Sequence, residues 1–185
     1  MVEEIFAELK SAMNKALSNL ERDFKRVRTG RATTALLEGI TVMAYGAPTP
    51  LNQLATLSAP EPRLLLIQPW DKTISGEIEK AILKSDLGLT PNNDGKVIRL
   101  TVPQLSEERR RELVKIVKKM AEEAKVAMRN ARREANEMLK ELKNDKEISE
   151  DEMFRRTEEV QKITDSFTLK ADELAAKKEK EIMEF

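Results

Sequence analysis

Cysteine and histidine are both absent from this chain of 185 residues. Without cysteine there is no disulfide framework and no thiol nucleophile, and without histidine the commonest general base and metal ligand is missing. Aromatic residues make up only 4% of the sequence, which favours a core of aliphatic side chains. No apolar run approaches the roughly 20 residues that span a membrane, and Glu3 and Glu4 interrupt any signal-like segment at the N-terminus. These absences predict a soluble cytoplasmic protein.

An excess of one charge is also missing, because 33 Lys and Arg residues balance 33 Asp and Glu residues. The net charge therefore predicts no class of partner, and any contact with a nucleic acid must come from a local patch. Charged residues nevertheless make up 36% of the chain. Abundant charge with few aromatic rings is typical of long helices that pack along narrow seams.

The longest uninterrupted helical pattern runs from Leu105 to Lys143 and contains neither glycine nor proline. At 1.5 Å per residue such a helix would be roughly 58 Å long. Ser106 is the predicted N-cap, and the acids that follow it suit the helix dipole. Apolar residues recur in steps of three and four, which predicts one buried stripe. That stripe comprises Leu113, Ile116, Val117, Met120, Ala124, Ala127, Ala131, Ala135, Met138 and Leu142.

The opposite face of this predicted helix is rich in cations. At 100° per residue the acids Glu112, Glu123, Glu137 and Glu141 fall on a flank, and no acid stands directly among the three clustered arginines. A solvated coiled-coil surface is one interpretation of such a face. Arginine forks also suit phosphates and base edges, which favours a site for RNA. The cations concerned are Lys118, Lys125, Arg129, Arg132, Arg133 and Lys140.

Two further helices are predicted, one at each end of the chain. Residues 2–28 carry the same seam spacing and end before Gly30, a natural helix stop. The last helix begins at Ser149, where Glu152 three residues later completes a capping box, and it ends near Ile182. Three long helices joined in this way predict an antiparallel bundle.

Nearly all proline and glycine lies between the first two long helices, which predicts a small inserted domain. We expect strands at 40–45, 54–57, 63–68 and 96–102, a helix at 75–85, and turns at 46–50 and 92–95. The fold class is therefore α+β, with a bundle of residues 1–30 and 104–185 and a β/α/β sandwich-like α/β domain of residues 31–103. A hinge is predicted where the two parts join, at Thr29, Gly30, Arg31, Pro103 and Gln104.

No catalytic constellation is visible in the sequence. There is no phosphate-binding glycine loop and no nucleophile motif, and the acids Asp71, Glu77, Glu79 and Asp86 are scattered. No calcium-loop spacing appears, so no metal is expected. Trp70 is interpreted as an anchor of the small domain's core, and Tyr45 as a strand residue before a turn. An enzyme is the least favoured class.

Six segments of the chain resemble the bacterial ribosome recycling factor family. They occur in the family's order and together span the whole chain, which makes the resemblance specific. The segments are RTGRA (28–32), YGAPTPLNQLA (45–55), DLGLTPNNDGKVIRL (86–100), LSEERRRELVK (105–115), MRNARREAN (128–136) and DKEISEDE (145–152).

This resemblance implies an L-shaped molecule of transfer-RNA-like dimensions that binds between the ribosomal subunits after termination. The family's contacts with ribosomal RNA match Arg129, Arg132 and Arg133, with Arg28 and Arg31 near the hinge. Elongation factor G is the implied partner, and it hydrolyses the GTP itself, so this chain needs no cofactor. The implied result is separation of the subunits and release of messenger RNA and deacylated transfer RNA. We expect a monomer that acts mechanically and is not an enzyme.

Two other classes of protein stay open on the residues alone. A general RNA-binding or chaperone-like helical protein would bind many RNAs with similar affinity. A structural scaffold would associate with other helices, whereas a self-sufficient bundle should be monomeric.

Overall fold

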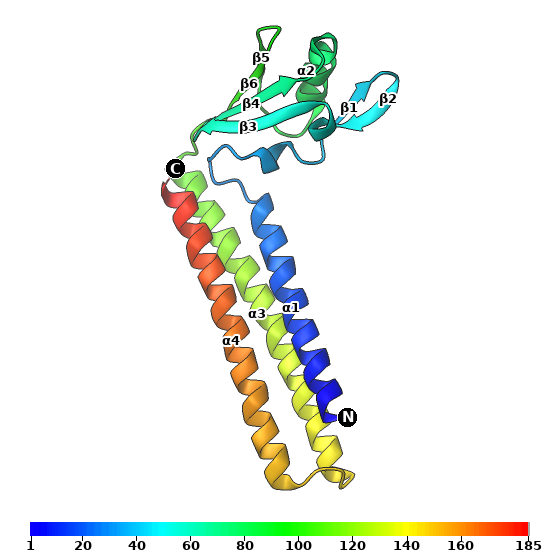
Figure 1. Ribbon diagram of the computed structural model, residues 1–185. Helices are drawn as coiled ribbons and strands as arrows, with labels where there is room; N and C mark the ends of the chain where they lie inside the picture. Colours follow the sequence, from blue (N-terminus) through cyan, green and yellow to red (C-terminus); the bar gives the residue numbers. More distant parts are fainter. Residues whose placement is uncertain (185) are drawn as a thin grey trace. The chain divides into compact units, whose positions relative to one another are not determined.

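The computed structural model describes residues 1–184 and divides the chain into two compact units (Figure 1). The first unit combines Met1–Val27 with Glu108–Glu184. The second consists of Arg28–Glu107. The bundle range predicted from the sequence extends to residue 185, which lies outside the described residues. The chain is thus an α+β protein.

Three long helices form the first unit: α1 Val2–Arg26, α3 Glu107–Asn144 and α4 Glu150–Glu184. All three helices predicted from the sequence are confirmed, with ends that differ by only a few residues. Helix α3 runs opposite to α1 and α4 (Figure 1), which confirms the antiparallel bundle. Small buried residues, among them Ala16 of α1 with Ala171 and Ala175 of α4, allow α1 and α4 to approach closely. No described helix has the length and apolarity needed to cross a membrane.

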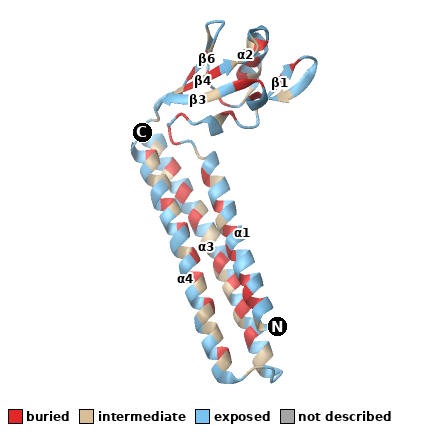
Figure 2. Cartoon of the chain, in the orientation of Figure 1, coloured by how far each residue is buried: buried red, intermediate tan, exposed pale blue. Residues whose placement is uncertain are grey.

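The buried stripe of α3 differs from the predicted one at several positions. Met128 and Leu139 are fully buried, whereas Ala127 is exposed and Ile116 and Met138 are 38% and 37% exposed. Placing Ile116, Ala127 and Met138 in the stripe was therefore wrong. Because α3 packs against two helices at once, its buried face is centred between them, and periodicity along one helix does not specify that centre. Figure 2 shows the buried residues on the sides of the helices that face one another.

The start of α4 confirms Ser149 as its N-cap. The Glu152 backbone N–H donates to Ser149 Oγ at 3.1 Å. The return bond of a capping box is not formed within residues 1–184, because the Glu152 carboxylate lies instead 3.9 Å from Arg156 of the next turn. The capping box predicted here is therefore only half formed, and an ion pair along the helix replaces its second half.

The second unit contains two antiparallel sheets and one α-helix. A two-stranded sheet pairs β1 with β2, and a four-stranded sheet has the order β3-β4-β6-β5. Helix α2, Ser75–Lys84, confirms the predicted helix and contacts β1 and β5. The strands are β1 Thr41–Ala44, β2 Ala47–Pro50, β3 Ala55–Glu61, β4 Leu64–Pro69, β5 Pro91–Asn93 and β6 Ile98–Thr101. Short 3-10 helices lie at Thr34–Leu37, Leu51–Gln53 and Lys72–Ile74.

Two strands of the second unit fall where turns were expected. Residues 47–50 pair with β1 as strand β2, and the turn lies earlier, at Tyr45 and Gly46, whose φ angles are 52° and 81°. Two consecutive positive φ angles are the mark of a tight hairpin turn. Asparagine or glycine is usual at the position in the turn that Tyr45 occupies. The sequence alone therefore favoured a turn at the prolines that follow. The short strand β5 lies at the sheet edge, where its proline costs no ladder bond.

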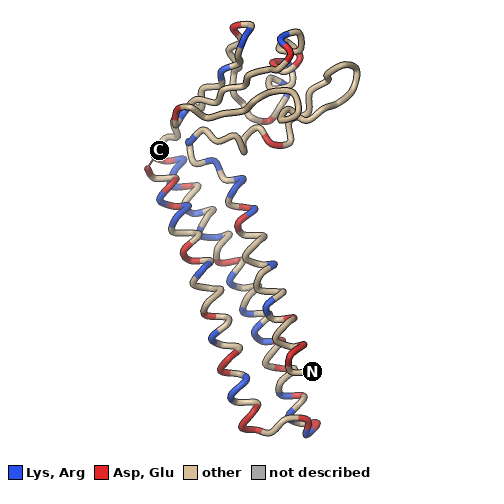
Figure 3. The backbone as a smooth tube through the Cα atoms, viewed as in Figure 1, with Lys and Arg blue, Asp and Glu red and all other residues tan. Residues whose placement is uncertain are grey.

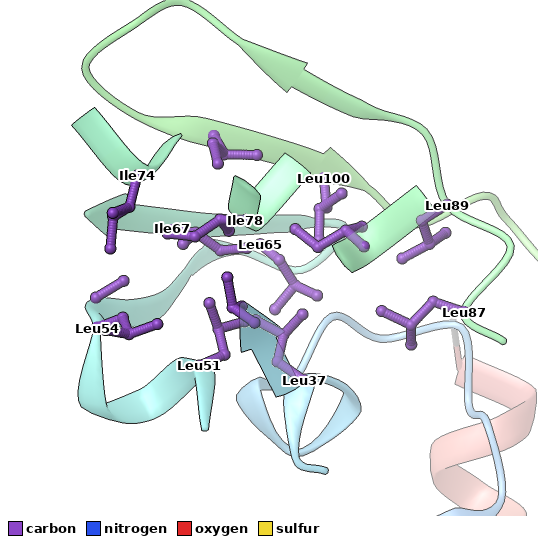
Figure 4. Close-up of a cluster of buried hydrophobic side chains, with 14 of the residues drawn as sticks. Leu37, Leu51, Leu54, Leu65, Ile67, Ile74, Ile78, Leu87, Leu89 and Leu100 are labelled. Carbon is purple, nitrogen blue, oxygen red and sulfur yellow. The ribbon is translucent and has the colours of Figure 1, made fainter. Parts of the chain in front are cut away.

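The core of the second unit is aliphatic (Figure 4). It includes fully buried residues from β4, β6 and α2, such as Leu65, Ile98 and Ile78. Trp70 is not among them: it is 66% exposed, and its indole N–H donates to Thr56 Oγ1 at 2.8 Å. The interpretation of Trp70 as a core anchor was therefore wrong. Aliphatic side chains fill the interior, and the ring lies against the outer surface after β4 has ended.

Candidate nucleic-acid interface

Three of the cations predicted for the exposed side of α3 have no partner in the described part of the chain. Lys118, Arg133 and Lys140 are exposed and form no hydrogen bond or ion pair with any other residue from 1 to 184. At 100° per residue they lie within one face of the helix. Figure 3 shows that both signs of charge are interspersed along the bundle as a whole. Unpaired cations on a rigid helix can bind an anion without first breaking an internal contact.

Arg129 lies on the same face but has an internal partner that the sequence analysis missed. Its Nη1 donates to Glu122 Oε1 at 2.9 Å, and Lys125 Nζ lies 3.5 Å from the other carboxylate oxygen. The hydrogen bond from Arg129 is the main reason that the Glu122 pKa lies below its ordinary value. The expectation that no acid stands among the arginines was therefore wrong. The sequence signal for this contact was the spacing of seven residues between Glu122 and Arg129, because seven residues are almost two full turns of a helix.

Arg132 lies on the flank of α3 that faces α4, and not opposite the buried stripe as predicted. The residue is half-buried, and its Nη1 lies 3.5 Å from Gln161 Oε1 in an exposed contact. Gln161 is itself oriented by donating to Asp165 Oδ1 at 2.8 Å. The charge of Arg132 therefore meets a neutral amide and not a carboxylate, so it stays available to an external anion at the edge of the bundle.

Lys125 is the cation of this set that belongs most clearly to the helix packing. Its side chain is only 21% exposed, and Nζ donates to Asp172 Oδ1 of α4 at 2.9 Å. This hydrogen bond raises the pKa of the ammonium group above its ordinary value. Lys125 therefore cross-links α3 and α4, and counting it among the outward cations was wrong.

The other two predicted contact residues, Arg28 and Arg31, lie in the second unit and are exposed. Arg28 Nη2 donates to the backbone carbonyls of Asp86 and Leu87 at 3.3 and 2.9 Å. These bonds hold the segment after α1 against the loop after α2. Arg28 thus has a structural contact in addition to any contact with RNA.

Backbone hydrogen bonds anchor each connecting segment beside the predicted hinge residues, and the Arg28 side chain ties the segment after α1 a second time. The Ala32 N–H donates to the Pro62 carbonyl at 2.7 Å, and the Val102 N–H donates to the Arg63 carbonyl at 2.8 Å. The two acceptors, Pro62 and Arg63, are thus adjacent residues of the turn between β3 and β4. The predicted hinge residues are Thr29, Gly30, Arg31, Pro103 and Gln104; Gly30 has a φ of 79°. Such a φ is comfortable only for glycine.

A groove of about 550 Å³ in the second unit is lined by side chains of both charges. It lies between the segment before β1 and helix α2, and its lining mixes acids such as Glu38 and Glu77 with cations such as Lys80 and Lys84. Among the described residues, no group of three or more acidic side chains is placed to hold a metal ion. The unpaired cations of α3 therefore remain the feature that supports binding of a polyanion.

Comparison with known proteins gives one consistent family. The family model described as "Ribosome recycling factor" matches residues 20–183. A ribosome-recycling factor from Syntrophobacter fumaroxidans is 60% identical over 184 residues. The alignment covers 100% of this chain and 100% of that relative. A second, from Natranaerobius thermophilus, is 58% identical over 184 residues, again with complete coverage of both chains.

Solved structures show the same similarity. A solution structure of the ribosome recycling factor matches with a TM-score of 0.80 and 47% identity, covering 100% of this chain and 98% of that one. A second match has a TM-score of 0.67 and 51% identity and covers 98% of each chain. It is described as models for the T. thermophilus ribosome recycling factor and the E. coli elongation factor G bound to the E. coli post-termination complex. On the family match and these full-length relatives, the chain belongs to the ribosome recycling factor family.

Proposed function

We propose that this chain recycles ribosomes in the cytoplasm after translation has terminated. It binds the post-termination ribosome and, with elongation factor G, separates the subunits and releases messenger RNA and deacylated transfer RNA. The observation that carries this proposal is the full-length similarity to relatives named for that activity. A similar factor has also been described together with elongation factor G on the post-termination complex. Elongation factor G binds and hydrolyses the GTP, so this chain acts as a translation factor and not as an enzyme.

The bundle supplies the surface for ribosomal RNA in this proposal. Arg129, Arg132 and Arg133 lie within about one turn of α3. Arg133 is unpaired in the described chain, Arg132 meets only the neutral amide of Gln161, and Arg129 is held by an exposed ion pair. Exposed ion pairs contribute little to stability, so an RNA phosphate can replace the carboxylate. Arg28 and Arg31, both exposed in the second unit, are the remaining proposed contacts with ribosomal RNA.

The helices also provide the stiffness that mechanical separation needs. Each of the three presents buried residues over most of its length. A force applied at one end of a packed bundle is transmitted along it, because close-packed interiors deform little. We propose that the segments around Gly30 and Pro103 bend when elongation factor G acts on the second unit, since both lie outside the anchoring bonds of Ala32 and Val102.

The proposed function is tested by polysome breakdown with elongation factor G and GTP, with and without this chain. Addition of the chain should convert polysomes to free subunits. Arg133→Ala should weaken binding to ribosomes by about tenfold, because a hydrogen bond to a charged group is lost. It should also lower the salt dependence of binding by about one counterion.

The matched control is Lys10→Ala, which removes an exposed cation from α1 without touching the proposed surface. This control should bind as the unaltered chain does. Equal binding of all RNAs, with no preference for ribosomes, would instead indicate a general RNA-binding protein. Failure to break down polysomes would refute the proposed function.

A further inference from the structure

We propose that Glu122 is an internal competitor of RNA phosphate: its carboxylate occupies Arg129 in the free protein and is displaced when RNA binds. The inference rests on the function proposed above, in which Arg129 and Arg133 contact ribosomal RNA. It adds a residue of opposite charge to that surface, one whose effect is to weaken binding and not to strengthen it.

The geometry holds the Glu122 carboxylate in place from two sides. One oxygen accepts from Arg129 Nη1 at 2.9 Å, and the other lies 3.5 Å from Lys125 Nζ. Lys125 is itself fixed, because it is largely buried and bonded to Asp172 of α4 at 2.9 Å. The packing of α3 on α4 therefore points the carboxylate toward Arg129 before any ligand arrives.

The pair has the features of a displaceable contact. The side chains of Arg129 and Glu122 are 40% and 55% exposed, so solvent and an external anion can reach both charged groups. Exposed ion pairs are screened by solvent and contribute little to folding. A carboxylate and a phosphate present the same oxygen geometry to a guanidinium, so the two compete for the same N–H donors.

Arg133 makes displacement favourable for RNA in particular. It lies one turn beyond Arg129 on the same face and has no partner within residues 1–184. A phosphate that binds Arg133 comes close to Arg129, where the Glu122 carboxylate repels it. Only a ligand that contacts both arginines gains enough to break the internal pair. Glu122 thus weakens the binding of polyanions that contact only one of the two arginines. It favours an RNA surface whose phosphates are spaced to contact both.

The test is Glu122→Gln, which removes the charge and keeps the size of the side chain. Binding is measured with purified large ribosomal subunits and with a mixed-sequence RNA duplex. We expect about two- to fivefold tighter binding to the subunits, the range that loss of an exposed ion pair allows. The duplex should gain more than the subunits do, so that preference for ribosomes falls. Unchanged or weaker binding to the subunits would overturn the inference, since Glu122 would then position Arg129 or play no part.

Two controls separate this effect from a general change of charge. Glu123→Gln removes the same charge from the neighbouring residue, which is exposed and unpaired in the described chain, and should tighten binding much less. In an Arg129→Ala background, Glu122→Gln should do no more than Glu123→Gln does. An equal gain from both glutamine variants would attribute the effect to net charge and overturn the inference.

Failure of the inference and failure of the proposed function give different results. If Arg129→Ala and Arg133→Ala weaken ribosome binding but Glu122→Gln does not tighten it, only the role of Glu122 is refuted. If neither arginine variant changes binding, the proposed RNA surface is refuted, and with it the competitor. Circular dichroism should show unchanged helix content in all four variants, because each altered side chain lies at the bundle surface.

Discussion

Asp94 organises the turn between β5 and β6 with a single side chain. One carboxylate oxygen accepts from the backbone N–H groups of Lys96 and Val97 at 2.9 and 2.8 Å. The other accepts from Arg99 Nη1 at 2.7 Å. These bonds, led by the one from the Val97 N–H, hold the pKa of Asp94 far below its ordinary value. An acidic side chain is needed here because only the ionised form accepts all of these bonds at once.

Asp94→Ala should lower the thermal midpoint of the second unit at pH 7. A depressed folded-state pKa means that ionised Asp94 stabilises the fold above its ordinary pKa of 3.8, and that this stabilisation is lost as the pH falls further. The midpoints of the unaltered chain and the variant should therefore converge below about pH 4. Asp94→Asn keeps an oxygen for the backbone amides, so its thermal midpoint at pH 7 should lie between those of the unaltered chain and Asp94→Ala. A gap that stays constant down to pH 2 would contradict this account.

At the scale of the element, the register of α3 depends on which side of the helix its two neighbours cover. The adjacent residues Val126, Ala127 and Met128 are all apolar, so a stripe through any of them satisfies the periodicity. In the structure Met128 is fully buried and Val126 is 45% exposed. The same rotation of the buried face brings Arg132 to the flank beside α4.

Met128→Ala should therefore destabilise the protein far more than Val126→Ala, although both shorten an apolar side chain of α3. Truncating a fully buried methionine costs about 2–5 kcal/mol, because a cavity is left. Truncating the exposed valine should change the free energy of unfolding by about 0.5 kcal/mol or less. Chemical denaturation followed by circular dichroism measures both values. Similar losses for the two variants would mean that the buried face of α3 is centred elsewhere.

At the scale of the whole molecule, the chain consists of two compact units with separate cores, joined by two short segments. The segment after α1 contains Gly30, whose φ of 79° is accessible to glycine but not to proline. Each segment is bonded to the turn between β3 and β4 through Ala32 or Val102. Bending between the units is therefore expected at the residues between these bonds and the helix ends.

Gly30→Pro should slow subunit separation by elongation factor G more than it weakens ribosome binding. Proline fixes φ near −65°, so this segment can no longer adopt the conformation that glycine provides. Ribosome pelleting measures binding, and light scattering with elongation factor G and GTP measures separation. Gly39→Pro is the matched control, because Gly39 also has a positive φ, of 83°, but lies further along the chain, outside the two segments that join the units. A normal rate of separation for Gly30→Pro would rule out a hinge at this position.

The sequence by itself determined the helices, the aliphatic cores and the cations of α3, because periodicity, caps and breakers act over a few neighbouring residues. It also excluded thiol chemistry through the absence of cysteine. Only the tertiary structure decided that Arg132 meets Gln161, that Lys125 binds Asp172 and that Trp70 lies outside the core. Each of these contacts joins residues of different elements, and their meeting depends on how those elements rotate as they pack. Arg133 contacts no residue of another element by a hydrogen bond or ion pair within residues 1–184. Its exposure could therefore be predicted from its position around α3 alone.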